Sequence, residues 1–305
     1  MAVPMRVLLP LLLASAAAAE EASSSAASSA DDATALLAVL KGLRKSGSYG
    51  RLKGSWNPRT NPCDGAWAGV QCEGGAVTGL DLTYLSLEGT LAPEIGDVRQ
   101  LVELKLDGNK LSSTLPAALG KLAALQRLSA RGNKFTLPLP AAMAGCASLT
   151  ELQLPGTMLI GEFPEVVYSL SSLTLLDLKR NAVNGTLSDR LCGLTNLQHL
   201  DLSDNEMEGS LPGCVGELGA LKSLVMRGNK VTGTIPPGLA TIAGLNSLDM
   251  KDNFLSGHIP EGFGDLDMDV FQLVNNPKLD PPDPKGPLAG LMGKRKLHAG
   301  RNRLN

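Results

Sequence analysis

The sequence predicts one elongated α/β solenoid in which short parallel strands, one from each coil, stack side by side over an apolar core. Three observations predict this fold. A pattern of leucines recurs at one fixed spacing between Val77 and Asn276. An asparagine follows the leucines in almost every copy, and glycine and proline come later at a nearly fixed offset. Because one coil cannot bury its own apolar row, the coils must stack to share a core.

The repeating unit has the form L-x-x-L-x-L-x-x-N-x-L. One clear copy runs from Leu101 to Leu111, and further copies begin at Leu125, Leu149, Leu173, Leu197, Leu221 and Leu245. Side chains alternate across a strand, so the leucines of L-x-L point to the core and their neighbours point outward. The pattern resembles the leucine-rich repeat. This resemblance implies a horseshoe with a parallel β-sheet on its concave face, built from about eight 24-residue repeats plus a terminal half repeat.

The ninth position of the unit forms a column of asparagines. Its members are Asn109, Asn133, Asn181, Asn205, Asn229, Asn253 and Asn276, whereas Leu85 and Thr157 depart from the rule. A side-chain amide both donates and accepts hydrogen bonds. We therefore expect the column to satisfy loop backbone groups of neighbouring coils that are closed to water.

The N-terminus has the layout of a secretory signal peptide. Arg6 precedes an apolar run from Val7 to Leu13, and small residues continue to Ala19. A membrane anchor is disfavoured, because the run is far shorter than the roughly 20 residues needed to cross a bilayer. Residues 1–19 are thus predicted to be removed, and the Ala/Ser-rich residues 20–30 to form a disordered leader. The mature chain is expected to be secreted and extracellular, in the apoplast or cell wall.

Residues 31–76 are predicted to form an N-terminal cap. Asp31, Asp32 or Thr34 can cap a helix that ends at Ser46-Gly47. The leucines on one face of this helix are Leu36, Leu37, Leu40 and Leu43. Such a face needs a partner, and the open end of the repeat stack provides one.

Two cysteines and two tryptophans follow in the cap. In a secreted chain, Cys63 and Cys72 indicate a small disulfide loop that contributes roughly 2–3 kcal/mol. Trp56 and Trp67 are expected in the core of the cap. The order Asp32-x-x-Ala-Leu-Leu, Trp56, then Cys63 through Trp67-x-Gly-Val-x-Cys72 resembles the N-terminal cap of plant-type extracellular leucine-rich repeat receptors and their secreted relatives.

Six units contain an apolar residue directly before a proline, and three of them have the full G-x-I/L-P element: Gly209-x-Leu211-Pro212, Gly233-x-Ile235-Pro236 and Gly257-x-Ile259-Pro260. Glycine permits an unusual backbone angle and proline disfavours helix before it, so each unit should turn through extended or 3₁₀ structure. One unit has Leu187-Ser188 instead. The element is similar to the plant-specific subclass of the repeat, and the resemblance covers roughly residues 31–279.

Three cysteines and one glycosylation motif lie within the repeats. Cys192 and Cys214 fall on adjacent coils in nearly the same phase, about 5 Å apart, which predicts a disulfide. A pair at this spacing also resembles one in plant receptor-like proteins. Cys146 lies two coils from Cys192 and should be a free, buried thiol. Asn184-Gly-Thr186 is an N-x-S/T acceptor, predicted to lie on a loop and to carry a glycan.

The outward positions of the strands are polar and mixed in sign. The candidate ligand-binding residues on this concave face are Arg127, Arg131, Asp177, Lys179, Arg180, His199, Asp201, Arg227, Asp249 and Lys251. Aromatic residues are almost absent, Tyr84 excepted, so a broad apolar contact is not expected. A peptide with ionised groups or an acidic wall polysaccharide fits better. The alternative is that these charges only solvate the sheet.

Catalytic motifs find little support in the sequence. Asp177 and Asp201 occupy the same column of neighbouring strands, about 5 Å apart, and could bind a cation or imitate a retaining glycosidase pair. Lys179 and Arg180 beside them favour an ordinary charge network. No phosphate loop, metal-ligand cluster or nucleophile motif is present, and we expect neither enzyme activity nor a cofactor. The strands also lack the R-x-R pair with which some peptide receptors of this family bind a terminal carboxylate.

The chain ends in a proline-rich and then basic segment, residues 280–305, which is predicted to be disordered and could attract polyanions. Aromatic residues at 3% and a net charge of -2 give no indication of nucleic-acid binding.

Together these features predict a secreted, non-catalytic recognition protein that binds a peptide, a cell-wall glycan or another leucine-rich repeat receptor. The resemblance implies a role in receptor-like signalling or defence. Two alternatives remain: an inhibitor of extracellular polygalacturonase, and the ectodomain of a receptor kinase whose membrane and kinase segments are missing.

Overall fold

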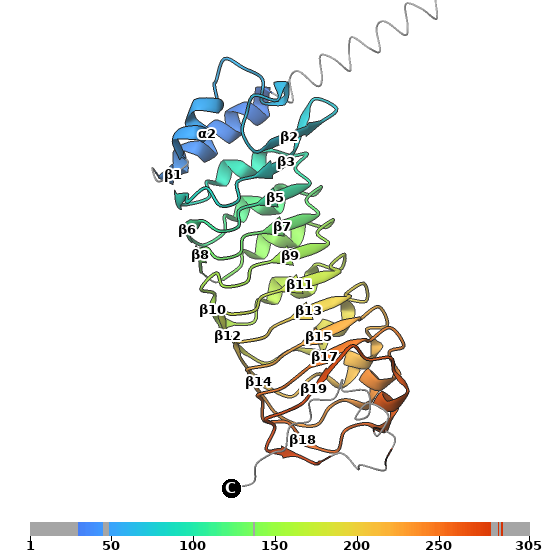
Figure 1. Ribbon diagram of the computed structural model, residues 1–305. Helices are drawn as coiled ribbons and strands as arrows, with labels where there is room; N and C mark the ends of the chain where they lie inside the picture. Colours follow the sequence, from blue (N-terminus) through green and yellow to red (C-terminus); the bar gives the residue numbers. More distant parts are fainter. Residues whose placement is uncertain (1–29, 45–48, 137, 282–285, 287, 289–305) are drawn as a thin grey trace, which may run out of the picture.

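The computed structural model describes residues 30–44, 49–136, 138–281, 286 and 288. The predicted signal peptide, nearly all of the predicted leader and most of the basic tail lie outside these residues. The described chain forms a curved stack of coils that follow one another in sequence order (Figure 1). The predicted leucine-rich repeat solenoid is therefore confirmed.

The concave sheet contains nine parallel strands and one antiparallel strand from the cap. In spatial order the strands are β19 (Val270–Gln272), β17 (Ser247–Asp249), β15 (Ser223–Val225), β13 (His199–Asp201), β11 (Leu175–Asp177), β9 (Glu151–Gln153), β7 (Arg127–Ser129), β5 (Glu103–Lys105), β3 (Ala76–Asp81) and β2 (Val70–Glu73). The register pairs equivalent residues, for example Leu176 with Leu200. These central leucines are buried, so neighbouring coils share one apolar core.

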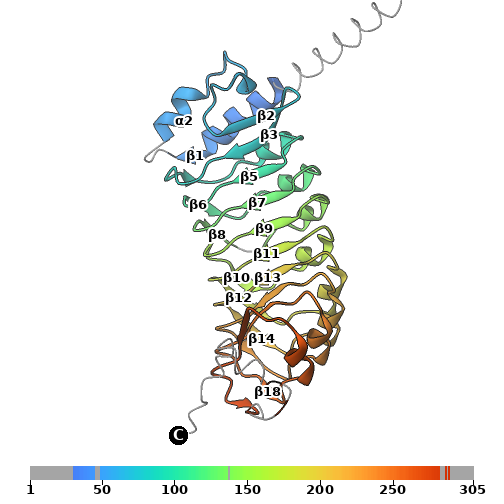
Figure 2. The same cartoon turned by 45° about the vertical axis from the view of Figure 1, so that its right-hand side comes forward.

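Short 3₁₀ helices occupy the other side of the core, as the glycine–proline element predicts. They are η2 (Pro93–Asp97), η3 (Ala117–Lys121), η4 (Ala141–Gly145), η5 (Glu165–Ser169), η6 (Asp189–Gly193), η7 (Gly213–Glu217), η8 (Pro237–Thr241) and η9 (Glu261–Asp265). In Figure 2 they lie to the right of the stack. In six of these eight helices a proline directly precedes the first residue, and Pro140 does so before η4 in an extended conformation.

A second row of strands runs along one flank, and the sequence analysis did not predict it. One sheet contains β1 (Leu43–Arg44), β4 (Glu88–Gly89), β6 (Lys110–Ser113) and β8 (Lys134–Phe135). The next contains β10 (Ile160–Glu162), β12 (Ala182–Gly185), β14 (Glu206–Gly209) and β16 (Lys230–Val231), and a third pairs β18 (Ser256–Gly257) with β20 (Lys278–Leu279). Asn184 lies in β12, so its predicted place on a loop is wrong. Its backbone belongs to a middle strand of the flank sheet.

The asparagine column has the predicted structural role. Asn229 is representative: its side-chain oxygen accepts a hydrogen bond from the Met207 amide at 2.9 Å. Its nitrogen donates to the carbonyls of Leu202 and Met226, each at 2.9 Å. The first two partners belong to the preceding coil and the third to its own coil. One buried amide therefore ties two coils together between the concave strand and the flank strand, where it satisfies backbone groups of both coils.

Two units lack the asparagine, and the following unit compensates. In the coil that carries Leu85, the amides of Leu85 and Leu87 both donate to Asn109 of the next coil, at 3.2 and 2.9 Å. In the coil that carries Thr157, that residue and Leu159 donate in the same way to Asn181, at 2.9 and 3.1 Å. The residue after each exception, Ser86 or Met158, has a left-handed backbone with φ of 54° or 64°. The coil thus keeps its bend at the cost of an unfavourable angle.

The cap covers the first coil with a helix over residues 30–42, α2 (Tyr49–Ser55) and η1 (Pro62–Asp64). The first helix ends earlier than predicted, because Leu43 and Arg44 form β1 and pair antiparallel with Gly89 and Glu88. The predicted helix end at Ser46-Gly47 and the helical position of Leu43 are therefore wrong.

The N-cap prediction for Asp31, Asp32 or Thr34 is also wrong, since the helix already includes residue 30. Asp32 instead accepts a hydrogen bond from the amide of Val77, at 2.9 Å, which joins the cap to the first repeat. Burial raises the pKa of the Asp32 carboxyl, the Val77 bond opposes this shift, and the charge of Asp31 adds to it.

The two tryptophans pack in the core of the cap as predicted. Trp56 and Trp67 are each 2% exposed, and their rings stack with centroids 5.5 Å apart. The indole nitrogen of Trp56 donates to the carbonyl of Ala68, and that of Trp67 to the hydroxyl of Thr60, both at 2.9 Å. Each buried donor therefore has a partner. The Cys63–Cys72 disulfide closes the same cap.

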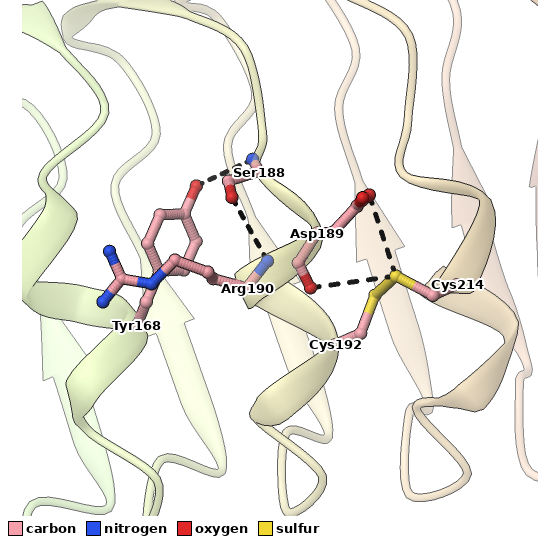
Figure 3. Close-up of a disulfide and its surroundings, with 6 residues drawn as sticks. All are labelled: Tyr168, Ser188, Asp189, Arg190, Cys192 and Cys214. Atoms are coloured by element: carbon pink, nitrogen blue, oxygen red, sulfur yellow. Dashed lines mark hydrogen bonds between the residues drawn. A yellow bond between two sulfur atoms is a disulfide. The ribbon is translucent and has the colours of Figure 1, made fainter.

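The structure also contains the Cys192–Cys214 disulfide, which joins η6 to η7 on adjacent coils with a Cα separation of 6.0 Å (Figure 3). The Sγ atom of Cys214 lies 3.8 Å from the carbonyl oxygen of Asp189 and 4.0 Å from its carboxylate. A half-cystine has no proton, so these are packing contacts rather than hydrogen bonds.

Figure 3 also explains why Ser188 replaces proline in this coil. Unlike proline, Ser188 has an amide proton, and it donates this proton to the hydroxyl of Tyr168 at 3.0 Å. Its own hydroxyl accepts from the amide of Arg190 at 3.2 Å and caps η6. The guanidinium of Arg190 lies 5.2 Å from the centre of the Tyr168 ring and pairs with Glu165.

Replacing a column asparagine should be costly. We expect Asn229→Ala to lower the free energy of unfolding by about 2–3 kcal/mol, because it leaves buried backbone groups of two coils without partners. Asn196→Ala is the matched control, since Asn196 is exposed and donates one bond, to the carbonyl of Ser171 at 3.0 Å. Chemical denaturation measures both; equal losses would contradict the structural role of the column.

The thiol of Cys146 should be unreactive in the folded protein. Its side chain is fully buried, it donates to the carbonyl of Leu119, and burial raises its pKa to about 11. Because the thiolate is the reactive form, a thiol reagent at pH 8 should modify no cysteine until denaturant is added, and then one. Rapid modification of the folded chain would contradict this burial.

Asp32→Asn should change how stability depends on pH. A carboxyl whose folded-state pKa is raised contributes most to stability at low pH, and this contribution is lost as the pH rises through that value. The asparagine variant has no such dependence at this position. Its stability relative to the unchanged protein should therefore fall as the pH is lowered from about 7 to about 4. Thermal unfolding at several pH values measures this difference, and a rise on acidification would refute it.

Candidate functional site

The candidate site is the outward face of the concave sheet, where consecutive strands present side chains at the spacing of the coils. The register places Asp177 of β11 beside Asp201 of β13, and Glu103 of β5 beside Arg127 of β7. Charges on neighbouring strands can therefore meet although a full repeat separates them in sequence. The predicted residues fall into several such groups.

The first group centres on Lys179. Its ammonium nitrogen lies 3.2 Å from a carboxylate oxygen of Asp177 and 3.2 Å from one of Asp201. Burial disfavours the charge of Lys179, but the two carboxylates outweigh burial and raise its pKa. Burial likewise raises the pKa of Asp177, against the opposing effect of Lys179. The ammonium group of Lys179 already bridges the carboxylates of Asp177 and Asp201. This geometry therefore favours the charge network over a glycosidase pair.

The second group contains Arg127, which donates to Glu103 at 2.7 Å, while Lys105 approaches the same carboxylate at 3.0 Å. Burial of Glu103 opposes ionisation, but the bonds from Arg127 and Lys105 outweigh it and lower the pKa of this carboxyl. The hydrogen bond to Glu103 raises the pKa of Arg127. Much of the charge of Arg127 is therefore satisfied within the protein.

Arg131 is less constrained. Its Nε atom lies 3.9 Å from the carboxylate of Asp107, and its side chain is 50% exposed. Asp107 is held by closer bonds from the hydroxyl of Ser129 at 2.5 Å and from the amide of Arg131 at 2.8 Å. The guanidinium of Arg131 is consequently available to a ligand.

Arg180 and Arg227 come together around Asp204. Nε of Arg180 lies 3.9 Å from its carboxylate, and a terminal nitrogen of Arg227 lies 3.6 Å from the same oxygen. Nε of Arg227 is one of two buried side-chain polar atoms without a hydrogen-bond partner among the described residues. The positive charge of this group exceeds its negative charge, so it suits an acidic ligand group.

The remaining predicted residues are Asp249, Lys251 and His199, and the charge of Arg227 reaches Asp249. Asp249 is buried and accepts a hydrogen bond from the amide of Lys251 at 3.3 Å. Burial raises the pKa of Asp249, against the bond and charge of Lys251 and the charge of Arg227. His199 opens β13 and is exposed.

Sequence reasoning omitted three carboxylates from the site: Glu103, Asp107 and Asp204. A signal was present, because Glu103 stands one repeat before Arg127 and Asp107 stands one repeat before Arg131. Pairing residues one period apart would have found both. Asp204 stands one repeat after Arg180 and would have been found in the same way.

Within the described ranges, no cluster of three or more histidine, cysteine, aspartate or glutamate side chains could hold a metal ion. No helix among the same residues is long and apolar enough to cross a membrane.

Comparison with protein families gives two matches. A leucine rich repeat N-terminal domain matches residues 29–73. Leucine rich repeats match residues 100–122, 196–218, 220–242 and 244–266. The first match covers most of the cap, and the others coincide with coils of the solenoid.

Two curated proteins of Arabidopsis thaliana are similar over part of the chain. Receptor-like kinase TMK4 is 38% identical over 81 residues, which are 27% of this chain and 8% of that protein. Leucine-rich repeat protein FLOR 1 is 41% identical over 70 residues, which are 23% of this chain and 20% of that protein. The matched segment thus spans at most a fifth of either relative.

Solved structures extend the likeness over most of the chain. The ectodomain of the receptor kinase GASSHO1/SCHENGEN3 from Arabidopsis thaliana, in complex with CASPARIAN STRIP INTEGRITY FACTOR 2, is 29% identical, with a TM-score of 0.72 over 78% of this chain and 29% of that one. The plant peptide hormone receptor RGFR1 in complex with RGF2 is 29% identical, with a TM-score of 0.59 over 61% and 30%.

A plant ice-binding protein shares the fold at 22% identity, with a TM-score of 0.64 over 80% of this chain and 86% of that one.

The family matches coincide with the cap and with the coils that the structure contains. The chain therefore contains the N-terminal domain and the repeats of leucine-rich repeat proteins, and the relatives named above are plant receptor-like kinases and leucine-rich repeat proteins.

Proposed function

We propose that this chain is a secreted, non-catalytic recognition protein that binds an ionised peptide along its concave face and acts in receptor-like signalling. The observation that carries the proposal is the sheet itself: the outward residues of its nine parallel strands are mostly polar, with Leu175, Val225 and Val270 among the exceptions. One solved relative is a plant peptide hormone receptor in complex with RGF2, and another is a receptor-kinase ectodomain in complex with CASPARIAN STRIP INTEGRITY FACTOR 2.

The charge distribution supports a peptide with carboxylate groups. Arg131 and Arg180 have side chains that are 50% and 70% exposed, and each lies no closer than 3.9 Å to its acidic neighbour. By contrast, the carboxylates of Asp177 and Glu103 are mostly covered, with 10% and 15% of their side chains exposed. A ligand therefore meets more accessible positive than negative charge on these strands.

Glycosylation at Asn184 is part of the same proposal. The residue is half-buried on the flank sheet, where its register partners are Glu162 in β10 and Glu206 in β14. A glycan there would lie on the flank, away from the concave sheet. It would leave the proposed peptide site open.

A displayed library of random twelve-residue peptides tests the proposal. Peptides selected on the folded chain should bind about tenfold more weakly to the double variant Arg131→Glu with Lys251→Glu, because the reversal removes attraction on the concave face. Lys121→Glu is the matched control, since Lys121 lies in η3 on the opposite side of the coil and is about equally exposed. It should change affinity by less than about twofold.

Calorimetry gives the affinities. If the library yields no binder, the peptide proposal fails. Binders that respond equally to both variants would place recognition outside the concave face.

A further inference from the structure

Each coil bends through a left-handed residue three positions after its concave strand. These nine residues, which we call the left-handed row, are Tyr84, Gly108, Gly132, Gly156, Arg180, Asp204, Gly228, Asp252 and Asn275. Their φ angles lie between 53° and 66°. The solenoid therefore imposes this conformation at the same place in every coil.

Two members of the row do not suit it. Glycine adopts a left-handed backbone freely, and asparagine and aspartate tolerate it. Tyr84 and Arg180 have φ of 53° and 56° without either advantage. Seven coils of the same protein solve the bend with a better residue. Strain retained at a site where alternatives are available points to a role for the side chain.

Both side chains are presented to solvent. Tyr84 is 80% exposed, the highest value among the exposed large apolar residues in the described part of the chain. Its ring lies against the backbone of Gly108: a Cβ atom there would come within 2.2 Å of the ring. Glycine at position 108 thus lets the ring lie flat on the next coil with its other face open. Arg180 has a side chain that is 70% exposed and only a loose contact with Asp204, at 3.9 Å.

The three residues of the row between them are all glycines: Gly108, Gly132 and Gly156. A Cβ atom at Gly132 would meet no atom within 4 Å, and one at Gly156 would meet only the Arg180 carbonyl, at 4.0 Å. The space above these two glycines is therefore open. Since coils stack about 4.8 Å apart, Tyr84 and Arg180 are separated by roughly 19 Å, the length of about six residues of extended chain.

We propose that Tyr84 and Arg180 are the two end anchors of an extended peptide that lies over the glycines of the row. A proline or other apolar side chain packs on the open face of Tyr84, and a carboxylate about six residues away binds Arg180. This inference rests on the proposed function, since it specifies where and how the peptide is held.

The test separates binding from folding. Tyr84→Asn and Arg180→Asn each remove an anchor but supply a residue that tolerates the bend, as Asn275 does in the same row. Each variant should unfold at the same temperature as the unchanged protein or higher. Each should also bind the library-selected peptides at least about tenfold more weakly, the loss typical of a residue that dominates an interface.

Gly132→Asn should block the same peptides by placing a side chain in their path, with only a small loss of stability because asparagine tolerates the left-handed angle less freely than glycine. Asp252→Asn is the matched control, because Asp252 belongs to the row but lies outside the segment between the anchors; it should change affinity by less than about twofold. The selected peptides should share an apolar residue and an acidic residue about six positions apart.

Several outcomes would overturn the inference. If selected peptides bind all four variants equally, the anchors are wrong while peptide recognition itself survives. If no peptide is selected, the proposed function fails as well. If a synthetic oligogalacturonide binds and loses affinity with the anchor variants while peptides do not, the anchors serve an acidic glycan and the peptide assignment is wrong. Variants that lose binding only together with stability would reduce both residues to a structural role.

Discussion

The architecture depends on satisfying backbone groups at a bend that lies inside the protein. Each coil passes from its concave strand to its flank through a left-handed residue, and buried backbone groups of this bend need partners outside the two ladders. A buried asparagine from the next coil supplies the missing donor and acceptor, as Asn229 does for Leu202 and Met207. Leucine packing gives the stack its core, but this polar column holds one coil in register with the next.

The same constraint limits which departures from the repeat pattern the fold tolerates. Where the ninth residue is Leu85 or Thr157, the following asparagine accepts a second amide and the backbone takes another left-handed residue. In the second case Thr157 also donates its own hydroxyl to the carbonyl of Leu154, at 2.8 Å, so part of the compensation comes from the same coil. Consecutive exceptions would leave no asparagine to compensate, and none occurs in this chain.

The concave strands and their inward leucines could be predicted because a constant period fixes which positions repeat. The flank strands could not, because residues such as Ala182 and Asn184 have no apolar alternation and pair only through main-chain groups. The end of the first helix was missed for a similar reason. Leu43 continues the apolar pattern of the helix, but its backbone pairs with β4 in a sheet.

The sequence predicted the position of the site better than it predicted which of its charges are free. The register of β11 and β13 was expected to bring Asp177 and Asp201 together, and the structure places them in register. Whether a charged residue is free or neutralised depends on side-chain geometry that no repeat pattern specifies. The ammonium of Lys179 contacts both carboxylates, whereas half of the Arg131 side chain is exposed to solvent. Sequence therefore identified the surface, and contacts decided which of its charges remain available.

The Cys192–Cys214 disulfide bears on how such a stack comes apart. Coils in a solenoid contact only their neighbours, so unfolding can start at either end and move along one coil at a time. A covalent bond joins η6 to η7, so the two coils that carry these helices cannot detach from each other. They must unfold as one unit. Fraying that begins at the C-terminal end should pause there. The coils that carry Arg131 and Arg180 would then remain folded after the last coils have opened.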